Sequence, residues 1–339
     1  MDINGYREAW FTVAAQIDPT LPPRGPIAHD ERIPFGEIRE RFDIAAAVVG
    51  KYRADLIRSF PLVTAVAVSL KYFHGRVSPH VPCITFFVAE KIPRNVVPEE
   101  IEGVPTDVVE AGTPALLASM PHKPGQKLRP AKPGTSVSHF NVSSGTFGCL
   151  VEDDQHKYVL SCAHVLANAT ASVGDAVLQP GSFYGGAVSN DQIASLTKTL
   201  LGSGAFIADA AIAKADDPSM VDPDILGIGK PSGVRTLNSV GWAVQKSGDI
   251  TGVTRGVVVG IKGTVGPLQI NGVPNVYFND VIITTGMSAN GDSGSLLLDN
   301  QNRAIGLLFA GLQFGSSYVV SWYSPIDTVL QNLGVRLVI

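Results

Sequence analysis

A chain of 339 residues is long enough for two or three domains. Its 45% hydrophobic and 17% charged residues describe a globular protein with ample core, which excludes a disordered chain. A net charge of −4 gives no basic footprint, so we expect no nucleic-acid partner.

Residues 1–35 form an N-terminal extension. The opening MDINGYREAWF begins with an acid after the methionine and has no basic stretch before its short apolar run, so it does not have the pattern of a signal peptide. No run of 18 apolar residues occurs, and PLVTAVAVSLKYF is interrupted by Lys71. We therefore expect a cytoplasmic protein with no membrane partner.

Residues 36–112 have the pattern of a small α+β accessory domain. Apolar residues recur every three or four positions from Gly36 to Phe60, which is helical spacing, and Pro61 ends the helix. The β-rich runs LVTAVAVSLKYF, CITFFVAEKI and TDVVEAG follow. One helix covering a small sheet is the expected arrangement.

Residues 113–144 are rich in proline, glycine and lysine. Five prolines lie between positions 114 and 133, and such a segment cannot build a packed core. We assign it as a linker.

Residues 145–339 contain many short apolar runs separated by glycine, asparagine and aspartate clusters. Examples are FGCLVED, KYVLSCAHVL, TRGVVVGI, NDVIITTG and AIGLLFAG. This density of short strands predicts a β sandwich or a pair of β barrels. Only PIDTVLQNLG near the end has a helical pattern.

The stretch MSANGDSGSLLL places Ser293 between two glycines and after an acid. A tight turn would use the same residues, because glycine reaches positive φ freely and Asp and Ser bond their own backbone. A nucleophilic serine needs more, namely a base that removes its proton and a third group that orients the base. The chain must therefore supply a histidine and an acid.

The candidates are His164, at the end of the strand-like run YVLSCAHVL, and Asp209, the one carboxylate set among small apolar residues in FIADAAIAKADD. A buried carboxylate is costly unless it is paired, and an imidazole N–H is a suitable partner. Taken singly, His164 is better explained by a structural hydrogen bond, and Asp209 is explained equally well by a turn cap.

The segments SCAH, DAAIA and GDSGSL, in this order, resemble the active-site boxes of the chymotrypsin/trypsin-like serine peptidases. The resemblance is closest to the bacterial relatives of the plant Narrow-leaf-1-type trypsin-like proteins, through CITFFVAEKIP, SVSHFNVSSGTFGCLV and VGWAVQKSGDITGVTRGVV. It runs from about Lys51 to the end of the chain.

The resemblance implies a mainly β fold, a chymotrypsin-like double β-barrel behind the α+β accessory domain. It implies a serine endopeptidase in which His164 is the general base, Asp209 orients it and Ser293 is the nucleophile. The N–H groups of Gly291 and Ser293 would form the oxyanion hole. The substrate is then a protein or peptide, and no cofactor is implied.

Further positions follow from the same resemblance. In many relatives a freshly cut amino terminus lies beside the acid before the serine, but no cleavage site opens this barrel, so Asp292 must find another partner. Met287 would floor the specificity pocket and Gly311 would line its wall, favouring an uncharged substrate residue. Asp249 and Ile250 stand where relatives carry an Arg-Thr pair.

Three cysteines without zinc-ligand spacing predict neither disulfides nor a metal site, and Cys162 is interpreted as a packed residue. An α/β-hydrolase esterase is strongly disfavoured, because it needs G-x-S-x-G with both partners after the serine. A catalytically silent or gated protein-binding module of the same fold stays as the alternative. A homo-oligomer is compatible with the accessory β edges.

Overall fold

The computed structural model describes residues 35–60, 62–73, 76–88, 96–110, 115–116, 125–200, 208–270, 273–314 and 317–339. All of the expected N-terminal extension except its last residue lies outside these ranges. None of the helices in the described part of the chain has both the length and the apolar character to cross a bilayer.

The segment after the extension forms one helix and a four-stranded sheet. Helix α2 (Phe35–Arg58) buries Ile38, Phe42, Ala45 and Val49 on one face, as the spacing predicted. It contacts strands β1 (Val63–Phe73) and β2 (Arg76–Val88). Strands β4 (Val104–Glu110) and β3 (Glu100–Ile101) continue the sheet beyond β2.

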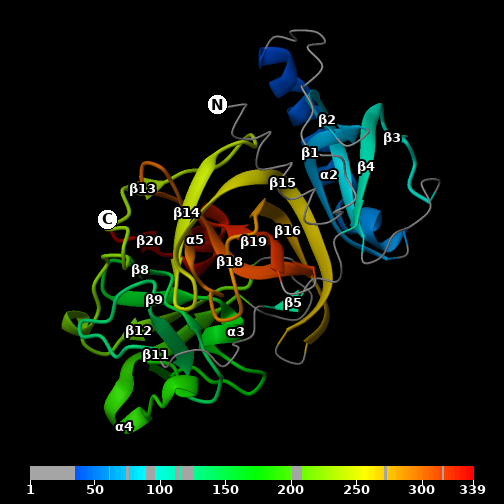
Figure 1. Ribbon diagram of the computed structural model, residues 1–339. Helices are drawn as coiled ribbons and strands as arrows, with labels where there is room; N and C mark the ends of the chain where they lie inside the picture. The colour runs from blue at the N-terminus through cyan, green and yellow to red at the C-terminus, as the bar shows by residue number, and fades with distance from the viewer. Residues whose placement is uncertain are drawn as a thin grey trace.

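This sheet is joined to the larger part of the molecule through strand β15 (Gly252–Ile270). The second half of β15 pairs with β1, with Ala65 opposite Val265, and its first half pairs with β14 (Ala243–Gly248). In Figure 1 the long yellow strands arch from the barrel towards the blue and cyan elements. One hydrophobic cluster includes Phe42 of α2, Val66 of β1 and Val258 of β15.

Six strands form the second barrel. Their order is β14, β17 (Leu296–Asp299), β18 (Arg303–Phe314), β19 (Ser317–Pro325), β16 (Val273–Thr285) and β15. The pairing of β14 with β15 closes this sheet on itself. Short strand β13 (Gly233–Val234) pairs with β18, and helix α5 (Ile326–Leu333), which the sequence predicted, follows β19.

Eight strands form the first curled sheet. Its order is β20 (Arg336–Leu337), β8 (Cys149–Glu152), β9 (Lys157–Ser161), β12 (Ala211–Ala215), β11 (Gln192–Thr199), β10 (Ala176–Leu178), β6 (Ser136–His139) and β7 (Gly145–Thr146). Helices α3 (Ala163–Leu166) and α4 (Val188–Asp191) lie in its connections. Strand β6 falls within the range assigned to the linker.

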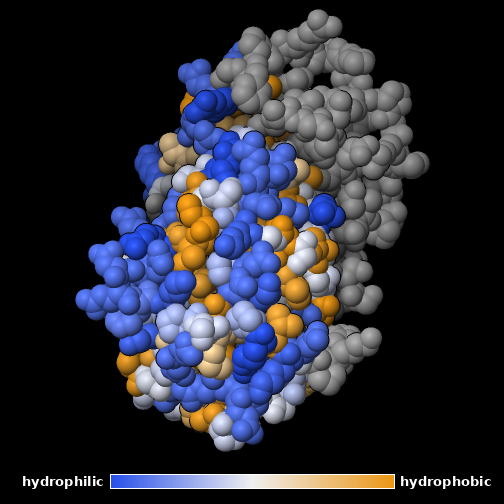
Figure 2. Space-filling view, turned by 90° about the vertical axis from the view of Figure 1, so that its left-hand side faces the viewer, coloured by the Kyte–Doolittle hydropathy of each residue, from blue (hydrophilic) through white to orange (hydrophobic). Residues whose placement is uncertain are grey.

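The expected fold class is confirmed: the molecule is mainly β, with two curled sheets that form a chymotrypsin-like double β-barrel. From β6 onwards the chain builds the first sheet, crosses to the second, and returns to the first through β20. On the face that Figure 2 presents, hydrophilic residues are interspersed with small hydrophobic patches. The connections α3 and residues 286–295 carry the expected base and nucleophile.

Candidate active site

His164 lies in the single turn of helix α3, directly after strand β9. Cys162 is the N-cap of this turn, and its extended backbone redirects the chain out of the strand. The amide of His164 donates to Oδ1 of Asp209 at 3.0 Å, and the ring Nδ1 is bonded to Oδ2 of the same carboxylate. The structure thus brings these two expected residues together through two contacts.

Asp209 is fully buried, two residues before the start of strand β12. A carboxylate at such a position is stable only when its oxygens are hydrogen-bonded. Both oxygens are occupied by His164, one by the backbone and one by the ring. The arrangement fixes the ring orientation and, with a proton on Nδ1, leaves Nε2 as the acceptor.

Ser293 lies in a glycine-rich turn between β16 and β17 and is fully buried. Gly291 and Gly294 have φ of +99° and +94°, which side chains other than glycine rarely tolerate. A Cβ on Gly294 would lie 2.0 Å from Oγ of Ser161. The carbonyl of Ser293 accepts from the amide of Thr146 at 2.8 Å. Glycine is therefore required here by close approach as well as by turn shape.

The segments that carry His164 and Ser293 meet at one carbonyl group, that of Leu308 in β18. It accepts from the amide of Gly294 at 2.7 Å and from the thiol of Cys162 at 2.9 Å. Burial and then Asp209 raise the pKa of that thiol well above its ordinary value, and the nearby Gly294 amide opposes the shift. Cys162 is thus a neutral packed residue that ties the two segments together, as expected.

Nε2 of His164 is the atom that would take the proton of Ser293. It is buried and has no hydrogen-bond partner among the described residues. The histidine side chain as a whole keeps 11% of its surface exposed. An imidazole whose Nδ1 is held by a carboxylate and whose Nε2 has no partner is oriented to accept a proton at Nε2. Hydrogen bonds between a base and a nucleophile often tighten only when substrate binds.

Donor atoms of Cys162, His164 and Asp209 lie within 4.8 Å of one another, a spacing compatible with a metal ion. A thiolate would be needed as ligand, but the pKa of Cys162 is raised and its sulfur donates to Leu308. Both Asp209 oxygens already accept from His164. These donors fit a hydrogen-bonded pair better than a metal site.

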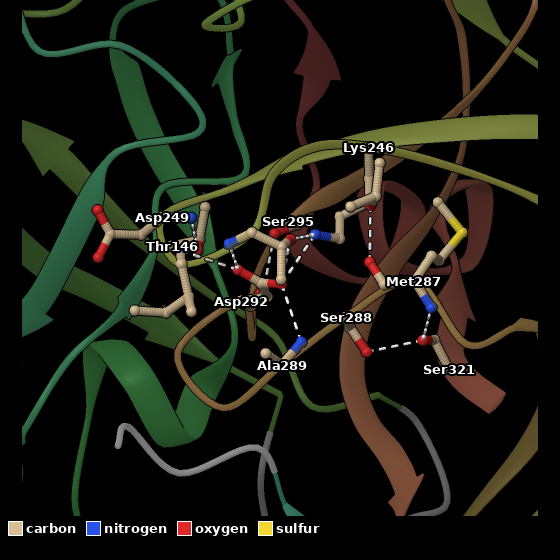
Figure 3. Close-up of polar contacts among 12 residues, drawn as sticks. Thr146, Lys246, Asp249, Met287, Ser288, Ala289, Asp292, Ser295 and Ser321 are labelled. Atoms are coloured by element: carbon tan, nitrogen blue, oxygen red, sulfur yellow. Dashed lines mark hydrogen bonds and ion pairs between the residues drawn. The ribbon is translucent and has the colours of Figure 1, made fainter. Parts of the chain in front are cut away.

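Asp292, the residue before Ser293, forms an ion pair with Lys246 of β14. The ammonium lies 2.8 Å from Oδ2, and both side chains are fully buried (Figure 3). Thr251 donates to the carboxylate through its hydroxyl at 2.6 Å and its amide at 3.2 Å. The amides of Ala289 and Ile250 donate as well, both at 3.0 Å. Five groups therefore hold the acid that precedes Ser293.

Burial lowers the pKa of Lys246, while Asp292 opposes that shift. The sequence analysis did not identify Lys246 as a functional residue. A lysine within a strand of a barrel was a weak signal, because side chains of lysine usually reach solvent from such positions. The structure shows it facing inwards, against the turn of residues 286–295, which we call the nucleophile turn after the role expected of Ser293.

Asp249 and Ile250 lie at the same turn. The Thr146 hydroxyl donates to the carbonyl of Gly291 at 2.9 Å and accepts from the amide of Asp249 at 3.0 Å. Ile250 fills the space beside Gly291, where a Cβ would lie 2.7 Å from it. Burial, with the nearby Asp292, raises the pKa of the Asp249 carboxyl to about 6, and the hydroxyl of Tyr184 opposes this shift.

The two expected pocket residues are connected through Ser321 of β19. The amide of Met287 donates to Oγ of Ser321 at 3.2 Å, and Ser321 is paired with Gly311 of β18. Ser288 shares a hydrogen bond of 2.7 Å with the same hydroxyl (Figure 3). Met287 and Gly311 are both buried. The structure therefore connects both to Ser321, Met287 from the loop after β16 and Gly311 from strand β18.

No family model and no curated protein matches this chain. Solved structures with a similar fold include Thermobifida fusca protease A, at 19% identity and a TM-score of 0.46, and a glutamic acid-specific serine protease, at 18% and 0.47. Cellulomonas bogoriensis chymotrypsin aligns at 19% and 0.44. These alignments cover 61% of this chain and 99–100% of the others. At such identities the chemistry must be deduced from this chain's own side chains.

Proposed function

We propose that the chain is a serine endopeptidase, related to the bacterial counterparts of the Narrow-leaf-1-type proteins. The observation that carries the proposal is the buried pair of His164 and Asp209, tied through Cys162 and Leu308 to the turn that presents Ser293. A structural histidine would have both ring nitrogens satisfied, whereas Nε2 has no hydrogen-bond partner among the described residues.

The reaction follows from the roles of these groups. Oγ of Ser293 attacks the substrate carbonyl carbon as Nε2 of His164 takes its proton. The imidazolium that forms is stabilised by Asp209. Amides of Gly291 and Ser293 receive the negative oxygen. The proton then passes to the leaving amine, and water releases the acyl group by the same steps.

The substrate preference is assigned to the region of Met287. An apolar, uncharged side chain at this position gives no partner to a lysine or arginine, so we assign preference for an uncharged residue before the scissile bond. Ser288 and Ser321, which are bonded to each other, leave little polar capacity for a charged group.

The test is covalent labelling with a fluorophosphonate at neutral pH, followed to completion by intact mass and peptide mapping. We expect a single adduct on Ser293 that is absent from Ser293→Ala and His164→Ala. An adduct elsewhere would contradict the assignment. A folded protein that never reacts would favour the silent binding module instead.

A further inference from the structure

One edge of strand β18 is lined, in order along the strand, by three different parts of the chain. Strand β17 pairs with it from Ala304 to Leu307. At Leu308 the partners are Gly294 and Ser295 of the nucleophile turn, bonded at 2.7 and 3.0 Å. The opposite edge of β18 is taken by β19. The continuation of this edge, beyond the nucleophile turn, begins after Leu308.

That continuation is occupied by β5 (Ala115–Leu116), which pairs antiparallel with Ala310 and Gly311. Figure 1 shows β5 beside the strands of the second barrel, although it comes from the segment that precedes the first barrel. Leu116 is paired with Ala310, two residues along β18 from Leu308, which bonds the nucleophile turn. Two residues along a strand span about 7 Å.

The direction of β5 matters as much as its position. Ala115 is opposite Gly311 and Leu116 is opposite Ala310, so the chain runs along β18 towards Leu308. A peptide bound in this direction delivers its following peptide bonds to Ser293. Strand β5 therefore has the orientation that the acyl side of an extended substrate would need, with main-chain hydrogen bonds as the source of affinity.

We infer that residues 115–116 are an autoinhibitory strand, which occupies the peptide-binding edge of β18 until a substrate displaces it. The inference rests on the proposed function, because occupying this edge inhibits an activity only if Ser293 is the nucleophile. An occupant on the same chain acts at an effective concentration of about millimolar, enough to exclude weakly bound peptides. Two residue pairs among the described residues hold it, so a tighter peptide can replace it.

The experiment compares the wild-type chain with the double variant Ala115→Pro/Leu116→Pro. In an antiparallel pair, alternate residues donate to the partner strand, so replacing both removes the donor whichever residue supplies it. The matched control is Ala115→Val/Leu116→Val, which keeps both N–H groups. Each protein is prepared with Ser293 and with Ser293→Ala.

Peptide binding is measured on the Ser293→Ala forms, with a dye-labelled peptide of residues 112–119, GTPALLAS. We expect the proline variant to bind it at least about tenfold more tightly than the wild-type and valine forms. Equal affinity in all three, or binding by none, would overturn the inference. This readout needs no catalysis.

Labelling by fluorophosphonate is measured on the forms that keep Ser293, and we expect it to be at least about tenfold faster in the proline variant, in parallel with the peptide affinities. If no protein is labelled while the peptide still prefers the proline variant, the endopeptidase assignment fails and the self-occupied edge stands. Equal peptide affinities with rapid labelling would instead overturn the self-occupied edge and support the endopeptidase assignment. Cutting of the wild-type chain within residues 112–124, seen by intact mass, would make the strand a substrate and also overturn the inference.

Discussion

Replacing Lys246 by methionine tests whether the buried ion pair holds the nucleophile turn. The side chain keeps its length and loses its charge, and Asp292 is left fully buried. Removing one partner of a buried pair costs about 3–5 kcal/mol. Asp292 retains its bonds from Thr251, Ala289 and Ile250, so we expect the lower end, about 3 kcal/mol of unfolding free energy.

Catalysis should suffer beyond the loss of stability. Asp292 lies between Gly291 and Ser293, whose amides are the assigned oxyanion donors, and loss of one such donor lowers kcat by about 10²–10³. We expect a decrease of this size in the rate of fluorophosphonate labelling. Urea unfolding and labelling below the unfolding transition separate the two effects.

The matched control is Lys262→Met, on the neighbouring strand β15. Lys262 pairs with Asp280 at 3.7 Å, with side chains 45% and 39% exposed, so its loss should cost less than about 1 kcal/mol. A stability loss for Lys246→Met that is no larger than this, with unchanged labelling, would refute the reasoning.

Replacing both partners of the ion pair gives an independent check on the cause. The double variant Lys246→Met/Asp292→Asn leaves no buried charge without a counterion. We expect it to recover stability at pH 7 without recovering labelling.

Three further variants test other parts of the site. Asp209→Asn should slow acylation by about 10⁴, because the ring of His164 then takes the wrong tautomer, whereas Asp216→Asn should not; the reverse, in labelling rates, would mean a wrong choice of acid. Because the pKa of Asp249 is raised, the wild type should lose about 1–2 kcal/mol of unfolding free energy as pH rises from about 4 to 6, after allowance for partial exposure. Asp249→Asn should remove this loss, and equal pH slopes of the two proteins in urea unfolding would contradict the prediction. Gly294→Ala should cost at least about 2 kcal/mol more than Gly174→Ala, since both glycines have positive φ but only Gly294 has no room for a Cβ; similar thermal shifts would contradict it.

The candidate triad could be identified from sequence because each member lies in a short segment with its own local pattern. His164 follows an apolar strand, Asp209 stands among small residues, and Ser293 is flanked by glycines. The helix α2 and the apolar strands were equally visible, since each has the 3.6-residue or two-residue period of a packed element.

Strand β6 shows where such patterns fail. Ser136, Val137, Ser138 and His139 are all buried, yet three of them are polar, so no hydrophobic alternation marks the strand. Their polar groups are satisfied inside the sheet, for example by the 2.7 Å bond between the hydroxyls of Ser136 and Ser144. Neighbouring prolines made the same residues resemble a linker.

Pairings between distant segments were invisible for a different reason. Strand β5 has two residues, too few for any period, and its partner lies almost 200 positions later in the chain. The join of β1 to β15 and the contact of Lys246 with Asp292 also depend on which strands become neighbours. Sequence reasoning required a partner for Asp292, but only the closed barrel identifies it.

Assembly of the site and access to it depend on different parts of the chain, the first on Lys246 and the second on β5. The ammonium that holds Asp292 belongs to strand β14, so the ion pair forms when the second barrel closes and needs no cut in the chain. A turn assembled by folding alone would leave Ser293 ready in every folded molecule. Restraint must then act on entry of the peptide, and the edge of β18 beside the turn is where β5 lies. Tighter peptide binding by Ala115→Pro/Leu116→Pro, in which Lys246 is unchanged, would therefore separate control of peptide entry from assembly of the turn.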